Sequence, residues 1–307
     1  MPLSSPGTFV LSSPNSGGSR FVAMLGQHTD CYGPLSLNLM ATERLVDLLD
    51  TLPSGGLHGL LRTVAQLYAG EQTLETIDMA KRWLYRRAHH KTAEVLREIM
   101  NRVAPRVLVE FSSLYSDTDL VTSLERIYSA FPDARYLHLT CHPVSQGSAW
   151  LRDSDALARL HQLRSLDDQA TTPIPDPQID WYRRNRSILD FLGRIPKKNR
   201  HHLRIEDLGS DARTSLARLS AWLGIAWNEQ QFESMLHPDN SVFACPGPFG
   251  AEGGAEAEFI AQPAFVPENL TNLFPAAPSL EQRLPWRPDG SRLRTETIDL
   301  AGLFGYE

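Results

Sequence analysis

Four short runs of β-branched, aromatic and leucine residues are spread along the chain, at positions 8–13, 106–110, 134–139 and 201–205. Between them, apolar residues recur every three or four positions. Runs of this length are typical of buried strands, and the intervening spacing is typical of amphipathic helices. Strands that alternate with helices pair in parallel through right-handed crossovers. The pattern therefore predicts an α/β fold with a central parallel sheet flanked by helices.

Two longer regions have patterns of their own. Between about residues 41 and 105, leucines such as Leu45, Leu48 and Leu49 have helical spacing, which predicts at least three helices. We also expect a helix over 118–130 and another over 210–223, ending at Gly224. Residues 245–285 are rich in Gly, Pro and Ala and predict a long irregular loop that closes over a cleft. We expect residues 1–307 to form a single domain.

Composition narrows the possible functions. The 307 residues are 42% hydrophobic and carry a net charge of −6, which excludes a disordered or fibrous chain and argues against a general nucleic-acid or membrane binder. Three widely spaced cysteines, Cys31, Cys141 and Cys245, lack C-x-x-C spacing and predict neither a disulfide framework nor a metal site. No apolar run approaches the roughly 18 residues of a membrane span. We expect a soluble, cytoplasmic protein.

A Gly-rich turn at residues 14–19 separates the first predicted strand from the first predicted helix. A helix N-terminus presents free N–H groups and the positive end of the helix dipole, which bind phosphate or sulfate oxygens. The turn lacks the G-x-x-x-x-G-K-[ST] and G-x-G-x-x-G spacings of nucleotide-binding loops. An ordinary tight turn remains the alternative. The residues predicted to form the anion site are Asn15, Ser16, Gly17, Gly18 and Ser19.

Five segments, taken in order, resemble sulfotransferases that use 3′-phosphoadenosine 5′-phosphosulfate (PAPS), especially the bacterial ones. They are residues 11–19, 26–30, 131–143, 204–208 and 303–307. The third, Phe-Pro-Asp-Ala-Arg-Tyr-Leu-His-Leu-Thr-Cys-His-Pro, is the most specific match. The resemblance covers nearly the whole chain and implies a sulfotransferase, P-loop-like fold with the donor bound at the Gly-rich turn.

Five polar or charged positions of that family differ here. The resemblance implies a basic residue in the first loop, a Glu base after the first helix, a Lys after the second strand, and an Arg and a Ser that hold the 3′-phosphate. The corresponding residues in this sequence are Asn15, Ser36, Phe111, Cys141 and Ala149. Because an amide or a thiol supplies no positive charge, we expect PAPS to bind poorly. The donor site is predicted to be degraded.

Three other side chains could replace the missing groups. Arg20 could supply a cation, unless it points to solvent, and His28 could accept a proton as the catalytic base. Ser148 is one residue from Ala149, and one residue turns a helical side chain by about 100°, which makes the replacement doubtful. We interpret His138 as structural and Cys141 as a buried small residue rather than a nucleophile.

Two clusters of basic residues stand out against the acidic net charge. They are either solvated faces or surfaces that recruit an acidic partner, such as a carrier protein that holds a tethered substrate. The clusters are Lys81, Arg82, Arg86, Arg87 and Lys91, and then Arg183, Arg184, Arg186, Arg194, Lys197, Lys198 and Arg200.

The sequence leaves three hypotheses for function. The first is a divergent sulfotransferase-like protein of bacterial natural-product tailoring, which installs sulfate or expels it in ring closure on a hydroxylated or sulfated small molecule. An intact sulfotransferase homologue would be its partner, and it would need no cofactor of its own. The second is a non-catalytic partner subunit. The third is an active PAPS-dependent sulfotransferase with an unusual phosphate site. None of the three involves nucleic acid, a membrane or a metal.

Overall fold

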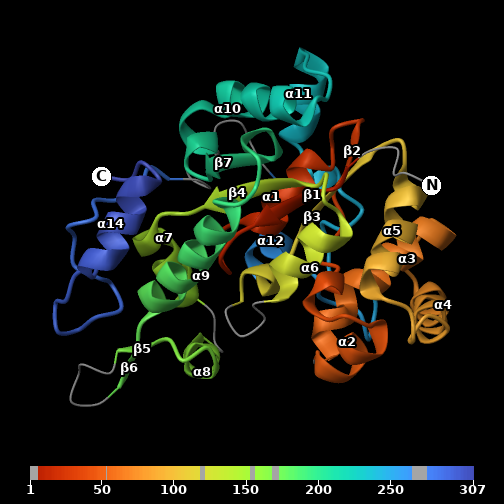
Figure 1. Ribbon diagram of the computed structural model, residues 1–307, viewed down its shortest axis with the longest axis horizontal. Coiled ribbons are helices and arrows are strands. Elements are labelled where there is room, and N and C mark those ends of the chain that lie inside the picture. The colour runs from red at the N-terminus through yellow and green to blue at the C-terminus, as the bar shows by residue number, and fades with distance from the viewer. Residues whose placement is uncertain (1–5, 53, 118–121, 153–155, 168–172, 265–274) are drawn as a thin grey trace.

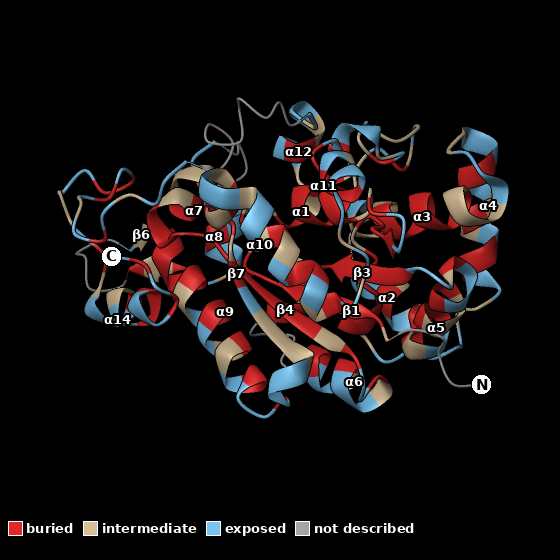
Figure 2. Cartoon of the chain, turned by 90° about the horizontal axis from the view of Figure 1, so that it is seen from above, coloured by how far each residue is buried: buried red, intermediate tan, exposed pale blue. Residues whose placement is uncertain are grey.

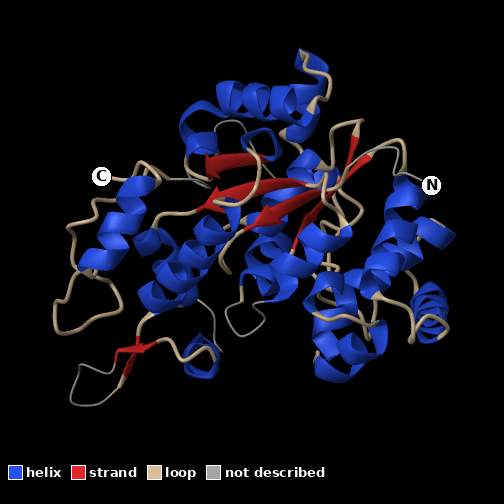
Figure 3. Cartoon of the chain, in the orientation of Figure 1, coloured by secondary structure: helices blue, strands red, loops and turns tan. Residues whose placement is uncertain are grey.

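The computed structural model describes residues 6–52, 54–117, 122–152, 156–167, 173–264 and 275–307. Its centre is a five-stranded parallel sheet in the order β2-β3-β1-β4-β7, with helices on both faces (Figures 1 and 3). The strands are β1 (Thr8–Leu11), β2 (Cys31–Tyr32), β3 (Val107–Phe111), β4 (Arg135–Thr140) and β7 (Arg200–Arg204). The predicted α/β fold with a central parallel sheet is thus confirmed.

Helices flank the sheet and connect its strands. The region expected to hold at least three helices contains four α-helices, and the helix expected over 210–223 begins earlier and ends at Gly224, as predicted. The helices are α1 (Gly18–Leu25), α2 (Leu45–Thr51), α3 (His58–Ala69), α4 (Leu74–Tyr85), α5 (Thr92–Val103), α6 (Thr122–Ala130), α7 (Pro143–Trp150), α8 (Ala156–Gln162), α9 (Pro177–Leu192), α10 (Asp207–Leu223), α11 (Glu229–Met235), α12 (Ala257–Ala261) and α14 (Thr295–Leu303). A small hairpin joins β5 (Leu166–Asp167) to β6 (Ile174–Pro175).

Side-chain alternation along the strands divides the core between the two faces of the sheet. In β1, Phe9 and Leu11 point into a cluster that includes residues of α2–α6 and α9, whereas Val10 points into a second cluster with residues of α1, α10 and α11. Both faces are therefore buried, as parallel sheets require. Figure 2 shows the inner strands in the colour of buried residues, between helices that expose their outer faces, whereas the edge strand β7 is largely intermediate or exposed.

The expectation of an irregular loop over 245–285 is only partly right. Residues 257–261 form the short helix α12, which turns the segment back toward α1, and residues 265–274 lie outside the described part of the chain. The composition hid this helix because one turn flanked by Gly and Pro has no detectable period. Among the described residues, no helix is long and apolar enough to cross a membrane.

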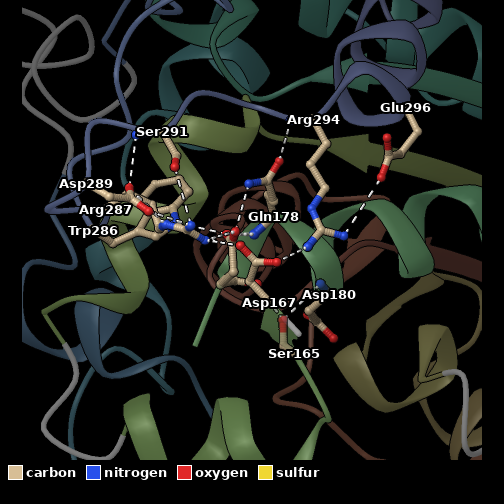
Figure 4. A network of polar contacts seen from close by, with 11 residues as sticks. Ser165, Asp167, Gln178, Asp180, Trp286, Arg287, Asp289, Ser291, Arg294 and Glu296 are labelled. Atoms are coloured by element: carbon tan, nitrogen blue, oxygen red, sulfur yellow. Dashed lines mark hydrogen bonds and ion pairs between the residues drawn. The ribbon is translucent and has the colours of Figure 1, made fainter. Parts of the chain in front are cut away.

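A buried network of ion pairs holds the C-terminal segment against the start of α9 (Figure 4). Arg287 donates from Nη1 to Asp167 at 2.5 Å and to Asp176 at 3.2 Å, and Arg294 donates to Asp167 at 2.7 Å. The indole N–H of Trp286 donates to Asp176 at 2.9 Å. This network joins the C-terminal segment to the β5–β6 hairpin and to the first turn of α9.

Candidate functional site

The first loop (residues 12–17) connects the carboxyl end of β1 to α1 at the middle of the sheet. Asn15 and Gly17 have left-handed backbone angles, with φ of 58° and 78°, which Asn and Gly adopt at little cost. The loop is held from two sides, because Gln146 of α7 donates to the carbonyl of Pro14 at 2.7 Å and Ser116 donates to that of Ser12 at 2.8 Å. The N-terminus of α1 is therefore rigidly placed for an anion.

A cavity of about 380 Å³ lies between the first loop and α7. Besides Gly17 and several apolar residues, including Pro275, Ala276 and Pro278, it is lined by polar and charged side chains. They are Asn15, Ser16, Arg20, Ser145, Ser148, Arg152, Glu206, Glu258 and Gln282. Five of the eight residues that the sequence assigned to a site therefore line this cavity, and Gly18 and Ser19 belong to the first turn of α1 beside it.

Arg20 lines this cavity and does not point to solvent, since only 3% of the residue is exposed. Its Nη2 atom donates to the carbonyls of Glu258 at 3.2 Å and Gln262 at 3.0 Å, at the end of α12. Burial lowers the pKa of Arg20, although the nearby Glu258 and Glu256 oppose this shift. Its Nε atom is buried and has no hydrogen-bond partner among the described residues, so the cation keeps one unused donor beside the first loop.

The opposite wall of the cavity carries the residues that follow β4. Ser148 lines the cavity, but its hydroxyl donates to the carbonyl of Val144 at 2.8 Å, which leaves only its lone pairs for a ligand. Ala149 has no polar group, and Arg152, one turn after Ser148, adds a cation that pairs with Glu258 at 3.4 Å. The sequence interpretation missed Arg152, because its position matches no motif.

Cys141, the residue that follows β4, belongs to a buried cluster formed by three of the motifs noted in the sequence. Glu206 accepts the backbone N–H of His142 at 2.7 Å and the hydroxyl of Tyr306 at 2.9 Å. Burial raises the pKa of the Cys141 thiol well above its usual value, and the Glu206 carboxylate raises it further. The thiol therefore stays protonated at neutral pH, which agrees with its interpretation as a buried small residue.

Two of the histidines are held neutral by their surroundings. His142 begins α7, and its Nδ1 accepts the N–H of Val144 at 3.2 Å, while burial lowers its pKa to about 4. His138 contacts the Asn185 amide at 2.9 Å, and burial lowers its pKa to about 3. His138 therefore has the structural role that the sequence suggested.

The structure does not bring His28 to the cavity. This residue follows the far end of α1, and a helix of eight residues spans about 12 Å. Its Nε2 contacts the carbonyl of Ala226 at 2.6 Å, and its Nδ1 accepts the N–H of Asp30 at 3.0 Å. Both ring nitrogens are engaged by backbone groups, and this geometry gives the predicted base no support.

Glu256 enters the site from the long segment after residue 245. Its Oε2 atom accepts the backbone N–H of Ser19 at 3.0 Å, and its own N–H donates to the Ser19 hydroxyl at 3.0 Å. Burial raises the pKa of Glu256, and Glu258 also raises it, whereas the Ser19 and Asn15 N–H groups and Arg20 lower it. The sequence interpretation missed this carboxylate because a single Glu in a Gly- and Ala-rich stretch has no diagnostic spacing.

The same segment covers the region around Ser36, the position where the family resemblance places a base. The N–H of Ser36 donates to the carbonyl of Gly254 at 3.1 Å, and Arg62 of α3 donates to the carbonyls of Gly253 and Cys245. Gly254 has a φ of 103°, and a Cβ there would lie 2.5 Å from the backbone of Gly59. The space left beneath, between Ser19, Phe111 and Phe259, is only about 10 Å³.

Phe111 fills the position where the resemblance implies a lysine. It is 4% exposed, and its ring packs so closely on the first turn of α1 that a Cβ on Gly18 would lie 2.5 Å from it. No cation therefore approaches the first loop from β3. Among the described residues, no group of three or more His, Cys, Asp or Glu side chains is arranged to hold a metal ion.

The members of the two basic clusters differ in burial and in ion pairing. Arg184 is buried and pairs with Asp180 at 2.7 Å and Asp117 at 3.0 Å, so it belongs to the core rather than to a surface. Arg87 pairs with Glu98 at 2.8 Å and stacks on Trp83. The remaining members include exposed side chains, namely Arg82, Arg86, Arg183, Arg186, Arg194, Lys197 and Lys198.

Comparison with known proteins agrees with this geometry. Residues 6–229 match the sequence pattern of the Sulfotransferase family. A sulfotransferase domain from the curacin biosynthetic pathway superposes with a TM-score of 0.77 at 23% identity, covering 98% of both chains. A sulfotransferase domain from the Synechococcus PCC 7002 olefin synthase superposes with a TM-score of 0.72 at 22% identity, covering 99% of this chain and 95% of that one.

No curated protein matches the chain. The two superpositions establish the fold over almost the full length of the chain, and the sequence pattern extends over most of it. Enzymes of this family generally take their sulfuryl group from PAPS. The chain belongs to the sulfotransferase family.

Proposed function

We propose that this chain is a divergent sulfotransferase-family protein of bacterial natural-product biosynthesis, with a donor site weaker than that of its family. Its substrate is a hydroxylated or already sulfated small molecule, on which sulfate is installed or expelled. The similarity to sulfotransferase domains of the curacin and olefin synthase systems supports the biosynthetic setting. The proposal assigns no cofactor of its own to the chain.

One observation carries the proposal. The cavity of about 380 Å³ keeps the first loop and the N-terminus of α1, but Asn15 and Cys141 stand where the family resemblance implies cations. The loop N–H groups and Arg20 fit a sulfuryl or phosphate group. The cavity wall that follows β4 fits the 3′-phosphate of PAPS less well. Cys141 and Ala149 carry no charge there, and Arg152 is already paired with Glu258. Each lost charge-assisted contact costs on the order of 1.5–3 kcal/mol of binding free energy.

A carrier-bound substrate and an intact homologue complete the proposal. A weak donor site is compensated if a second sulfotransferase supplies the sulfated substrate or the donor. The exposed lysines Lys197 and Lys198, together with Arg82 and Arg86, offer local positive charge to an acidic carrier on a chain whose net charge is −6.

A second candidate function is that of an ordinary PAPS-dependent transferase with an unusual phosphate site. The specific observation in its favour is Arg152, which faces the cavity one helical turn from Ser148 and would reach a phosphate if it left Glu258. The remaining hypothesis, a non-catalytic partner subunit, has the same donor-site chemistry as the divergent sulfotransferase-like protein and differs from it only in turnover.

A transfer assay separates these functions. The purified chain is mixed with PAPS and a hydroxyacyl carrier protein, with and without an intact sulfotransferase homologue, and mass spectrometry follows the gain or loss of a sulfuryl group. We expect turnover to depend on the homologue and to fall when the first loop is altered by Ser16→Ala and Gly17→Ala. Rapid transfer by the chain alone would favour the second candidate. Turnover that depends on the homologue but is unchanged by the Ser16→Ala and Gly17→Ala substitutions would indicate a non-catalytic subunit.

A further inference from the structure

The N-terminus of α1 already holds a carboxyl group that belongs to this chain. The Glu256 carboxylate accepts the Ser19 N–H at 3.0 Å, and the backbone N–H of Asn15 also acts on it. The second carboxylate oxygen, Oε1, is buried and has no hydrogen-bond partner among the described residues. A carboxylate at this place uses the free N–H groups and the helix dipole that would otherwise serve a sulfate or phosphate.

Two buried hydrogen-bond donors near this carboxylate form no hydrogen bond with it or with any other described residue. Arg20 Nε and Asn15 Nδ2 are both buried beside the first loop and lack partners among the described residues. Arg20 instead uses its Nη2 atom to bind the carbonyls at the end of α12. A buried guanidinium N–H without a partner is costly, so these donors suit a ligand with more oxygens than one carboxylate has.

The segment that carries Glu256 also closes the other side of the site. Between residues 251 and 262 it pairs with Ser36 through Gly254, and with α1 through Ser19 and Arg20. Phe259 is 2% exposed and closes the space of about 10 Å³ beneath the segment. An acceptor cannot enter that space, and an oxyanion cannot occupy the Ser19 N–H, unless this segment moves.

We propose that Glu256 is a built-in competitor for the oxyanion site at the N-terminus of α1, so that a sulfate or phosphate ester binds there only when residues 251–262 move away. The inference rests on the proposed function only in treating the first loop as a ligand site. It concerns whether the oxyanion site is occupied by Glu256 or free, and it does not concern the sulfuryl-transfer reaction. The chain is self-inhibited until a ligand or a partner displaces the segment.

The expected size of the effect follows from competition. A group tethered within the same chain competes at a high effective concentration, typically millimolar for a flexible tether. The apparent dissociation constant of an external anion equals its intrinsic value divided by the fraction of molecules in which the site is free. Removing the Glu256 carboxylate should therefore lower the apparent Kd by about tenfold or more.

Calorimetric titration of Glu256→Ala with inorganic sulfate and with adenosine 3′,5′-bisphosphate (PAP) tests the proposal. Glu256→Gln, which loses the charge but keeps the shape, should shift the Kd in the same direction. The matched control is Glu252→Gln, which removes a charge from the same segment at an exposed side chain that does not contact the first loop. The control should bind within about twofold of the unmodified chain. Equal affinities for all four proteins, or no binding by any, would overturn the proposal.

Hydrogen exchange on the unmodified chain provides a second test that needs no variant to fold. Saturating PAP or sulfate should leave the Ser19 amide protected while exchange within residues 251–262 becomes faster. Slower exchange in that segment would mean that ligand and Glu256 occupy the site together, which contradicts competition. Both tests report binding alone, so an inactive chain in the transfer assay leaves them interpretable, and a failed competition leaves the proposed function standing.

Discussion

Asn15→Lys, Cys141→Arg and Ala149→Ser together should raise the affinity of the chain for PAP by about a hundredfold or more. Two new cations would face the cavity, and each charge-assisted phosphate contact contributes on the order of 1.5–3 kcal/mol. The gain is reduced at residue 15, where a left-handed φ of 58° suits Asn better than Lys, and at residue 141, where a new Arg would partly pair with Glu206.

Calorimetry on this triple variant measures the gain. The matched control is Asn15→Gln with Cys141→Gln and Ala149→Ser, which has similar bulk but no added charge, and we expect its affinity to stay near that of the unmodified chain. If the charged variant folds with an unchanged melting temperature and still binds PAP no better than this control, the missing cations are not what weakens the site.

Replacing Arg287 with methionine should lower the free energy of unfolding by about 3–5 kcal/mol. The arginine side chain is 6% exposed, and its loss leaves the buried Asp176 and Asp167 without their shared cation (Figure 4). Arg294 still pairs with Asp167, which limits the damage at that carboxylate. Removal of one member of a buried charge network costs far more than removal of an exposed charge.

Urea unfolding followed by circular dichroism measures this change. Arg283→Met serves as the control, because Arg283 is exposed on the same segment, and we expect it to change stability by less than about 0.5 kcal/mol. A loss of under 1 kcal/mol for Arg287→Met would show that the C-terminal segment is not anchored by this network.

The strands that could be predicted from the sequence are those with a long enough run of strand-forming residues. β1, β3, β4 and β7 are runs of four to six residues, long enough for their composition to be recognised. β2 has only two residues, Cys31 and Tyr32, and no pattern can predict a strand of that length. Its place at the edge of the sheet is set by pairing with β3, a tertiary contact.

Some parts of the candidate site could likewise be predicted from the sequence, and others could not. The anion loop could be predicted because a strand, a Gly-rich turn and a helix are contiguous in sequence. Glu256 could not, because it reaches Ser19 across 237 residues. The retained motifs around Thr140, Glu206 and Tyr306 proved to be one packed cluster, in which the Tyr306 hydroxyl bridges the other two at 3.3 and 2.9 Å. Their retention therefore reflects how the fold is held together, and it gives no evidence of donor binding.

Calorimetric titration of the unmodified chain with PAPS tests the central claim, that the donor site is weak, most directly. Loss of two charge-assisted contacts weakens binding on the order of a thousandfold relative to a site that has them, so we predict a dissociation constant well above micromolar. Micromolar or tighter binding by the unmodified chain alone would contradict the claim and establish this protein as an ordinary PAPS-binding member of its family.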